Sequence, residues 1–247
     1  MSVTWLRADW PALEGVVAGT TLRAEGCSAG RYKSLNLGSH VGDDPDAVAR
    51  NRELFRNTCD LPAEPRWLRQ VHGTAVANGT SLPEPEADAM HTDLPGVVCA
   101  VLTADCLPVV LAARTGRSIA VAHAGWRGLA DGILEETVAA MACDACKVQA
   151  WLGPAISQAA FEVSDDVRQR FVEQDAGAAA DFRPNARGRW QADLYGLARR
   201  RLAGCGVTEV YGGGRCTYGE PLHFFSYRRD GACGRMATFV FRQDEIA

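Results

Sequence analysis

Hydrophobic residues recur along the chain in short runs rich in β-branched side chains, and polar or glycine-containing turns separate these runs. Runs of this length and composition are typical of buried β-strands. We therefore predict strands at 67–71, 97–103, 109–112, 118–123, 148–152, 207–211 and 237–241.

A second periodicity, with apolar residues three or four positions apart, predicts amphipathic helices between the strands. Asp44 followed by Pro45 is typical of a helix start, because aspartate caps free backbone N–H groups and proline suits the first turn. The first predicted helix is 45–58, and a second begins just after His123, with one face formed by Leu129, Ile133, Thr137, Val138 and Met141. A third is capped by Ser164. A fourth contains Leu194, Leu197, Ala198 and Leu202 and stops at Gly204.

The order of these elements favours an α+β fold. The early strands do not alternate regularly with long helices, which argues for layered mixed β-sheets and helices over a doubly wound parallel sheet. No repeat, low-complexity tract or linker divides the chain, and we interpret the proline-rich segment 81–96 as an ordered loop. We expect a single domain over 1–247.

Composition narrows the classes of function. Hydrophobic residues make up 47% of the chain and charged residues 23%, which is ordinary for a globular protein. The formal net charge is −4 and no basic run occurs, so nothing indicates nucleic-acid binding, and a small-molecule substrate is the better expectation.

The chain also lacks the marks of an exported or membrane protein. Residues 1–15 contain no basic region followed by an apolar core. The most apolar stretch, 96–113, is interrupted by Asp105 and Pro108 and is shorter than the ~20 residues of a membrane-spanning helix. We expect a cytoplasmic monomer in which the nine cysteines stay reduced and mostly pack as small core residues.

Three residues with metal-ligand chemistry lie where predicted strands end. His72 in QVHG and His123 in HAGWRG stand beside glycine-containing turns, and Cys106 in TADC follows an apolar strand. Zinc binds imidazole nitrogen and thiolate sulfur, and a catalytic zinc keeps three protein ligands and one open position. The spacing forms no local motif, however, and by itself favours hydrogen-bonded histidines and a buried thiol.

The local chemistry of HAGWRG shifts the balance toward a site. Glycines flank Trp126 and Arg127 just before a predicted helix, whose first N–H groups and dipole favour an anion. Arg127 would add a bidentate donor for phosphate or for a developing negative charge. The alternative for Arg127 is a surface ion pair.

Several motifs, read in order, resemble the YfiH family, the group labelled laccase-domain or polyphenol oxidoreductase proteins and later purine nucleoside phosphorylases. The combination of TADC with HAGWRG is highly specific to this family. The matching segments run nearly end to end: NLGSHVGDDP with NR (36–52), QVHG (70–73), ADAM with its following residues (87–92), TADCLPVVL (103–111), HAGWRG (123–128), LGPAI (152–156), FEV (161–163), CT (216–217), FFSYRRDG (224–231) and GR (234–235).

The resemblance implies that His72, Cys106 and His123 bind zinc, and that the layered α+β fold is shared with a group of proposed cysteine hydrolases. We see no departure from the family at these three positions. Five residues of matching segments are candidates for the surrounding pocket: Asn36, His40 and Arg228 for substrate binding, and Asp105 and Arg127 for catalysis.

Some of these residues have alternative roles. Asp105 is either a general acid or base, or a residue that orients a histidine ligand. His40 either lines the pocket or belongs to the loop that leads to a helix. Cys216 either lines the same pocket or packs. Cys143 and Cys146 form a lone C-x-x-C, which we interpret as incidental because a structural zinc needs four ligands.

The function that the resemblance implies is purine nucleoside chemistry, with a purine nucleoside and phosphate as partners. It comprises phosphorolysis of adenosine, inosine and guanosine, cleavage of methylthioadenosine, and deamination of adenosine. A zinc centre suits deamination because it activates water, and the metal with Arg127 suits the orientation of phosphate.

Three alternatives remain. A multicopper oxidase needs more imidazoles than five histidines with no H-x-H pair provide, although copper in place of zinc could give slight polyphenol oxidase activity. A peptidoglycan-precursor editing hydrolase, also implied by the family, would use the same zinc for amide cleavage. A non-enzymatic zinc-binding protein fits least, because structural zinc sites are closed by four ligands.

Overall fold

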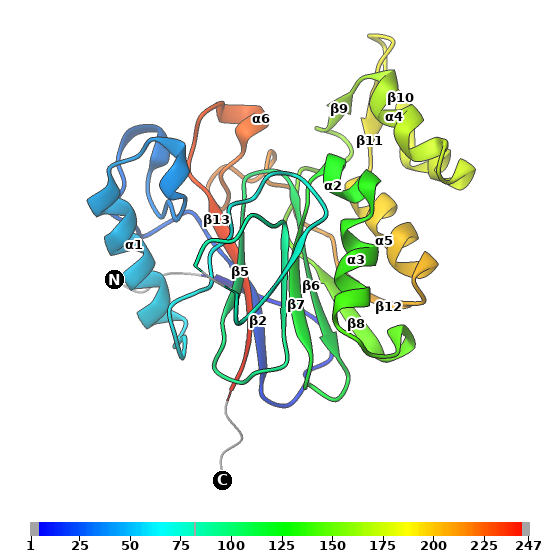
Figure 1. Ribbon diagram of the computed structural model, residues 1–247. Coiled ribbons are helices and arrows are strands. Elements are labelled where there is room, and N and C mark those ends of the chain that lie inside the picture. Colours follow the sequence, from blue (N-terminus) through cyan, green and yellow to red (C-terminus); the bar gives the residue numbers. More distant parts are fainter. Residues whose placement is uncertain (1–4, 82, 244–247) are drawn as a thin grey trace.

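A computed structural model gives the structure of residues 5–81 and 83–243, and it confirms an α+β fold of several sheets and helices. Two sheets lie face to face at the centre, helices cover both outer faces, and a small third sheet lies to one side (Figure 1). No helix in these two ranges is long and apolar enough to cross a membrane.

The larger central sheet has six strands in the order β12-β8-β6-β7-β4-β3. Its middle strands β6 and β7 are antiparallel, whereas the edge pairs β12–β8 and β3–β4 are parallel. The bounds are β3 (Val76–Asn78), β4 (Ala89–Thr92), β6 (Leu107–Ala113), β7 (Ile119–Ala124), β8 (Val148–Leu152) and β12 (Glu209–Gly212).

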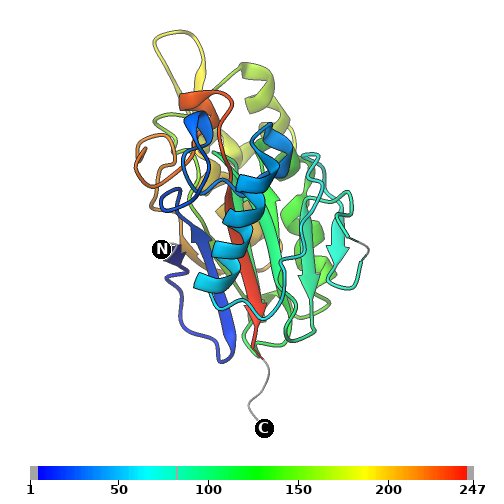
Figure 2. The same ribbon diagram turned by 90° about the vertical axis from the view of Figure 1, so that its left-hand side faces the viewer.

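The smaller central sheet has the order β1-β2-β13-β5, and all its neighbouring pairs are antiparallel. Its outer face is covered by α1 (Pro45–Thr58), where the ring of Phe55 lies 5.1 Å from that of Phe239 (Figure 2). As predicted, Asp44 caps α1 by accepting a hydrogen bond from the Asp46 N–H. The strands are β1 (Trp5–Arg7), β2 (Val16–Thr21), β5 (Cys99–Thr103) and β13 (Met236–Arg242).

The two sheets stack because each central strand is apolar on both faces. In β7, Ile119 and Val121 belong to the core between the sheets, whereas Ala120 and Ala122 belong to the core under the helices. Successive residues of a strand point to opposite faces, so both faces of β7 are buried. This explains why the sequences of these strands are continuously apolar rather than alternating between apolar and polar residues.

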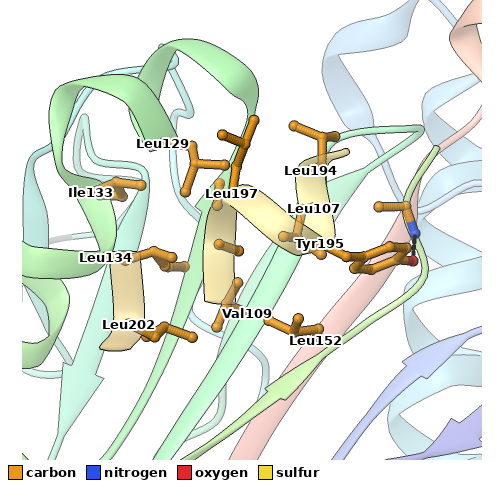
Figure 3. Packing of buried hydrophobic residues seen from close by; sticks show 14 of the residues in the cluster. Leu107, Val109, Leu129, Ile133, Leu134, Leu152, Leu194, Tyr195, Leu197 and Leu202 are labelled. Atoms are coloured by element: carbon orange, nitrogen blue, oxygen red, sulfur yellow. Dashed lines mark hydrogen bonds between the residues drawn. The ribbon is translucent and has the colours of Figure 1, made fainter. Parts of the chain in front are cut away.

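The outer face of the six-stranded sheet is covered by α2 (Trp126–Asp131), α3 (Ile133–Ala140) and α5 (Leu194–Gly204). Figure 3 shows Leu134 and Leu202 from these helices packing over Val109 of β6. The third sheet consists of β9 (Glu162–Val163), β10 (Phe182–Pro184) and β11 (Trp190–Ala192). The remaining helices are α4 (Asp165–Val172), α6 (Tyr227–Asp230) and the 3-10 helices η1 (Gly30–Tyr32), η2 (Ser39–Val41), η3 (Ala145–Lys147) and η4 (Ala176–Asp181). The small third sheet, α4 and η4 extend the core under the helices to one side, because Val163, Phe171 and Phe182 belong to it.

Three local predictions were wrong. The segment 67–71 forms only isolated bridges, because the side-chain amide of Gln70, rather than a neighbouring backbone, pairs with Leu102 N–H and C=O. The helix after His123 is two helices, since Gly132 between them has a left-handed backbone with φ of 102°. The predicted loop 81–96 contains strand β4; its residue 82 lies outside the described residues. That 1–247 acts as one domain stays a prediction.

Candidate metal centre

The segment that joins the two central sheets carries the cysteine of the candidate site. Ala104, Asp105 and Cys106 form the whole connection between β5 of the smaller sheet and β6 of the larger one. Asp105 makes this crossing with φ of 95°, a left-handed backbone that is rare outside glycine. Its carboxylate holds the turn by accepting hydrogen bonds from Thr217 Oγ1 at 2.6 Å and from the Arg228 N–H at 2.7 Å.

His72, Cys106 and His123 meet where β6 starts and β7 ends. One donor atom from each residue lies within 4.8 Å of the other two, and Cys106 Sγ is 3.9 Å from His72 Nε2. His123 belongs to β7 and is almost fully buried, Cys106 is half-buried, and His72 is exposed in a turn with φ of 64°. The structure therefore brings together the three residues that the sequence singled out.

One buried carboxylate, that of Asp88, organises both histidines. Its Oδ1 lies 2.8 Å from His123 Nδ1 and accepts the His72 backbone N–H at 2.9 Å, while Oδ2 accepts the N–H groups of Val71 and Gly73. Because Nδ1 of His123 is hydrogen-bonded to Asp88, Nε2 is the ring nitrogen that remains available to bind a metal ion. Second partners of this kind fix the orientation of metal-binding histidines.

A glycine leaves room for the cluster. A Cβ on Gly125 would lie 3.1 Å from both Cys106 Sγ and His72 Cδ2, so any side chain at this position would crowd the donors. This close approach explains the first glycine of GWRG, which the sequence suggested only in general terms. The second, Gly128, passes close to the Gly73 carbonyl, which would lie 2.8 Å from an added Cβ.

The electrostatics of the cluster favour a thiolate. Burial opposes ionisation of Cys106, but the charge and hydrogen bonds of His123 and His72 outweigh it and lower the pKa of the thiol to about 6. Burial likewise opposes charging of His123, yet Cys106 and Asp88 raise its pKa to about 9. Burial raises the pKa of Asp88, and its hydrogen bonds from His123 and the backbone more than reverse this, so the net direction is downward.

The donor set fits a divalent metal ion. In a tetrahedral zinc site, bonds of about 2.0–2.3 Å place donor atoms about 3.3–3.7 Å apart, close to the observed separation of Cys106 and His72. A thiolate and two imidazoles suit zinc or copper better than hard cations. In the part of the chain that the structure describes, this is the one cluster of side chains with metal-ligand geometry. Cys143 and Cys146 do not belong to it, and His91 lies on β4 beside Asn78.

The three donors line a cavity of about 480 Å³. Apolar and aromatic side chains form much of its wall, including Trp126, Ile156 and Phe161, and small-molecule sites typically have this size and lining. Its walls come from both central sheets and from the helices α2 and α6, which lie at the same end of the molecule (Figure 1).

Four of the five predicted pocket residues line this cavity: His40, Asp105, Arg127 and Arg228. Asn36 does not, because it is fully buried and its side chain bonds to Gly38, Asp43 and the backbone of Arg235. Cys216 lines a neighbouring cavity of about 560 Å³, of which Arg228 is also a wall.

Sequence reasoning missed three contributors. Asp88 stands in ADAM, a motif that carried the resemblance, but no local signal assigned it to a histidine 35 positions away. Gln70 of QVHG fixes the end of β5 and also lines the cavity. Arg235, in the matching GR segment, is a third arginine of the cavity beside Arg127 and Arg228.

This combination of fold and site is that of a laccase-domain protein, and comparison with known proteins agrees. The family model described as multi-copper polyphenol oxidoreductase laccase matches residues 17–243, and the chain belongs to this family.

Relatives within the family carry a more specific name. The purine nucleoside phosphorylase YfiH of Escherichia coli (strain K12) is 50% identical over 94% of this chain and 96% of its own length. The purine nucleoside phosphorylase of Pseudomonas aeruginosa is 48% identical over 97% of this chain and 99% of its own. A crystal structure of a Neisseria meningitidis protein, 50% identical, superposes with a TM-score of 0.94 and covers 97% of this chain and 99% of that one.

Proposed function

We propose that the chain is a zinc-dependent purine nucleoside phosphorylase that also deaminates adenosine. The observation that carries the proposal is a set of three donors, one thiolate and two imidazoles, that opens onto a cavity large enough for a nucleoside. Three protein ligands with an open position are typical of catalytic zinc. The names of the relatives support purine nucleosides as the substrate class. The proposed substrates are adenosine, inosine, guanosine and methylthioadenosine.

Phosphate is an anion, and the charge of the cavity supports its binding. The cavity wall contains Arg127, Arg228 and Arg235, and none of the three pairs with a carboxylate of the described residues. The single carboxylate of the wall is Asp105, which already accepts two hydrogen bonds. A wall with an excess of unpaired guanidinium groups attracts anionic ligands.

In phosphorolysis, a phosphate oxygen attacks C1′ of the ribose and the C1′–N9 bond breaks. The electron pair of that bond leaves with the purine, which takes up a proton, so the products are ribose 1-phosphate and the free base. A bound zinc ion would supply Lewis-acid activation of a substrate oxygen or of water. Arg127, exposed on α2 and stacked 4.4 Å from the ring of Trp126, is proposed to face the negative charge that develops.

Asp105 was considered either as a general acid or base or as a residue that orients a metal ligand, and its contacts favour the second role. Both oxygens of its carboxylate are engaged, by Thr217 and by Arg228, and the residue holds a left-handed turn next to Cys106. These contacts support a positioning role over that of a general acid or base. The contacts of Asn36 likewise support positioning, through Arg235, rather than contact with substrate.

The metal is proposed to be zinc, with copper as a substitute on the same donors. Five histidines cannot furnish the several copper sites that the family description names, so we derive no multicopper mechanism. The protein is further proposed to work as a cytoplasmic monomer with a small-molecule substrate.

The test is product analysis on a panel of purine nucleosides, with and without phosphate, using protein of known zinc content. Phosphate-dependent release of free base with ribose 1-phosphate is the expected result, and inosine formed from adenosine reports deamination. A zinc-loaded protein that forms neither product would contradict the proposal and would leave cell-wall precursors as the next substrates to assay.

A further inference from the structure

The positively charged side chains of the cavity come from different parts of the fold. Arg127 stands on α2, above the six-stranded sheet. Arg235 stands directly before β13 of the other sheet, and His40 of η2 lines the cavity as well. Arg235 is anchored from both sides, because its own N–H donates to Asn36 Oδ1 at 2.9 Å and its neighbour Met236 pairs with Thr103 of β5.

The guanidinium of Arg235 is held with one edge free. Its Nη1 donates to the carbonyl oxygens of Cys233 at 2.9 Å and of Gly234 at 3.0 Å. Its Nε and Nη2 have no hydrogen-bond partner among the described residues, and these two nitrogens form the edge that binds two oxygens of an anion side by side. The group is therefore preorganised before any ligand arrives.

The loop before α1 is built around this arginine. Asn36 Oδ1 accepts both the Gly38 N–H and the Arg235 N–H, which ties the loop to the start of β13. A Cβ on Gly38 would lie 2.9 Å from Arg235 Cγ, so the glycine lets the loop pack directly on the arginine stem. This packing places η2, and with it His40, at the same cavity wall.

His40 stands in a field of positive charge. Burial is the largest cause that lowers the pKa of His40, and the charges of Arg235 and Arg52 lower it further, while Glu84 acts least and in the opposite sense. An anion bound at this wall would relieve that repulsion. A neutral imidazole would in addition donate one hydrogen bond to it.

The guanidinium groups of the other two arginines of the cavity are less well oriented to bind an anion. The Arg127 guanidinium lies over the ring of Trp126, and no hydrogen bond to the described residues orients it. The Arg228 guanidinium donates Nη1 to the Glu162 carbonyl and lies 5.3 Å from the ring of Phe161. Arg235 alone of the three is oriented by two backbone carbonyls with its bidentate edge free.

We propose that Arg235 and His40 form the subsite for inorganic phosphate, on the wall formed by η2 and the start of β13, with Asn36 as the residue that positions Arg235. The inference rests on the proposed function and deepens it, because it moves the phosphate from Arg127, where the sequence placed it, to the start of β13. The purine and ribose then lie between this wall and the aromatic side chains of Trp126 and Phe161.

The test compares Arg235→Lys, His40→Gln and Arg127→Lys with wild type, all with matched zinc content. The phosphate concentration for half-maximal phosphorolysis should rise by about tenfold or more in Arg235→Lys, because lysine keeps the charge but loses the two-pronged contact. His40→Gln, at an exposed position of η2, should raise it several-fold without loss of folding. In both variants the phosphate dependence should change more than the nucleoside KM or the rate of deamination, because deamination uses no phosphate. Arg183→Lys, exposed on β10 and outside the cavity, is the matched control for the arginine variants.

Binding measured without turnover separates this inference from the proposed function. Calorimetric titration of the zinc-loaded protein with inorganic phosphate, and separately with adenosine 5′-monophosphate, should show weaker binding of inorganic phosphate in Arg235→Lys even if no nucleoside is cleaved. Unchanged affinity for inorganic phosphate in Arg235→Lys would overturn the inference. A loss confined to Arg127→Lys, or confined to the nucleotide, would also overturn it.

Discussion

The carboxylate of Asp88 and the imidazole of His123 form a buried pair, with Oδ1 and Nδ1 2.8 Å apart, and the same carboxylate accepts the backbone N–H of His72. Two of the three proposed ligands are therefore held by one side chain that is itself fully buried. The pair explains how residues 51 positions apart in the sequence keep a fixed geometry on a strand and in an exposed turn.

Asp88→Asn should weaken zinc binding by about 10- to 100-fold, the usual cost of losing a partner behind a metal ligand. Both oxygens of the Asp88 carboxylate accept hydrogen bonds, so replacing either one by the NH₂ group of asparagine sets that group against backbone or ring N–H donors that it cannot bind. Competition with a chromogenic chelator measures the affinity. Asp93→Asn, exposed just after β4, is the control, and equal affinities of the two variants would refute the role of Asp88.

Gly125→Ala should lower zinc affinity while leaving the protein folded. The added methyl group would press on Cys106 Sγ and His72 Cδ2 from 3.1 Å, and both can shift only by spoiling the donor geometry. Gly204→Ala adds the same methyl group in open space at the end of α5 and serves as the control. Comparable zinc affinity and melting temperature in both variants would show that the site has more room than the structure indicates.

Substitution of the histidines should separate ligands from bystanders. His72→Ala and His123→Ala should each abolish phosphorolysis and lose most of the bound zinc, because two remaining donors hold zinc poorly. His91→Ala should retain both, since the ring of His91 lies on β4 beside Asn78 and outside the cavity. The site is misassigned if His91→Ala proves as damaging as the other two.

The buried thiols of Cys59 and Cys99 should make the fold sensitive to alkaline pH. Burial raises the pKa of each to about 12, above that of an unfolded cysteine, about 8.5. The unfolded chain therefore loses these protons first, and the stability that the thiols contribute below about pH 8.5 declines as the pH rises toward 12.

Denaturant unfolding followed at several pH values measures this decline. Cys99→Ser should flatten it, because serine does not ionise in this range. Labelling with iodoacetamide at pH 8 gives an independent check: the exposed Cys27 and Cys146 should react, and Cys59 and Cys99 should not. Rapid labelling of Cys99 in the folded protein would contradict the burial on which the argument depends.

Much of the fold follows from the sequence because its central strands are continuously apolar. Runs such as 148–152 coincide with a strand, and Asp44 and Pro45 mark the start of α1 as expected. The early strands β1 and β2 were not predicted: β2 pairs with β13, more than 200 positions away, and β1 pairs in turn with β2. Hydrogen bonds of that range leave no local pattern.

The residues of the candidate site likewise divide into those that the sequence identifies and those that only the folded structure identifies. Its three donors could be named because histidine and cysteine at strand ends carry recognisable chemistry and a specific family resemblance. Asp88 and Arg235 could not, because aspartate and arginine are common surface residues and only the folded chain shows which atoms they bind. Asn36 stood in a matching segment, and the folded chain shows that its fully buried side chain accepts the Arg235 N–H.

The most direct measurement is the rate of ribose 1-phosphate formation from adenosine and phosphate as zinc is returned to metal-free protein. The account predicts that the rate rises linearly and levels off at one zinc per chain, and that Cys106→Ala neither binds this equivalent nor forms the product. Product formation by the metal-free protein, or full zinc binding by Cys106→Ala, would contradict it.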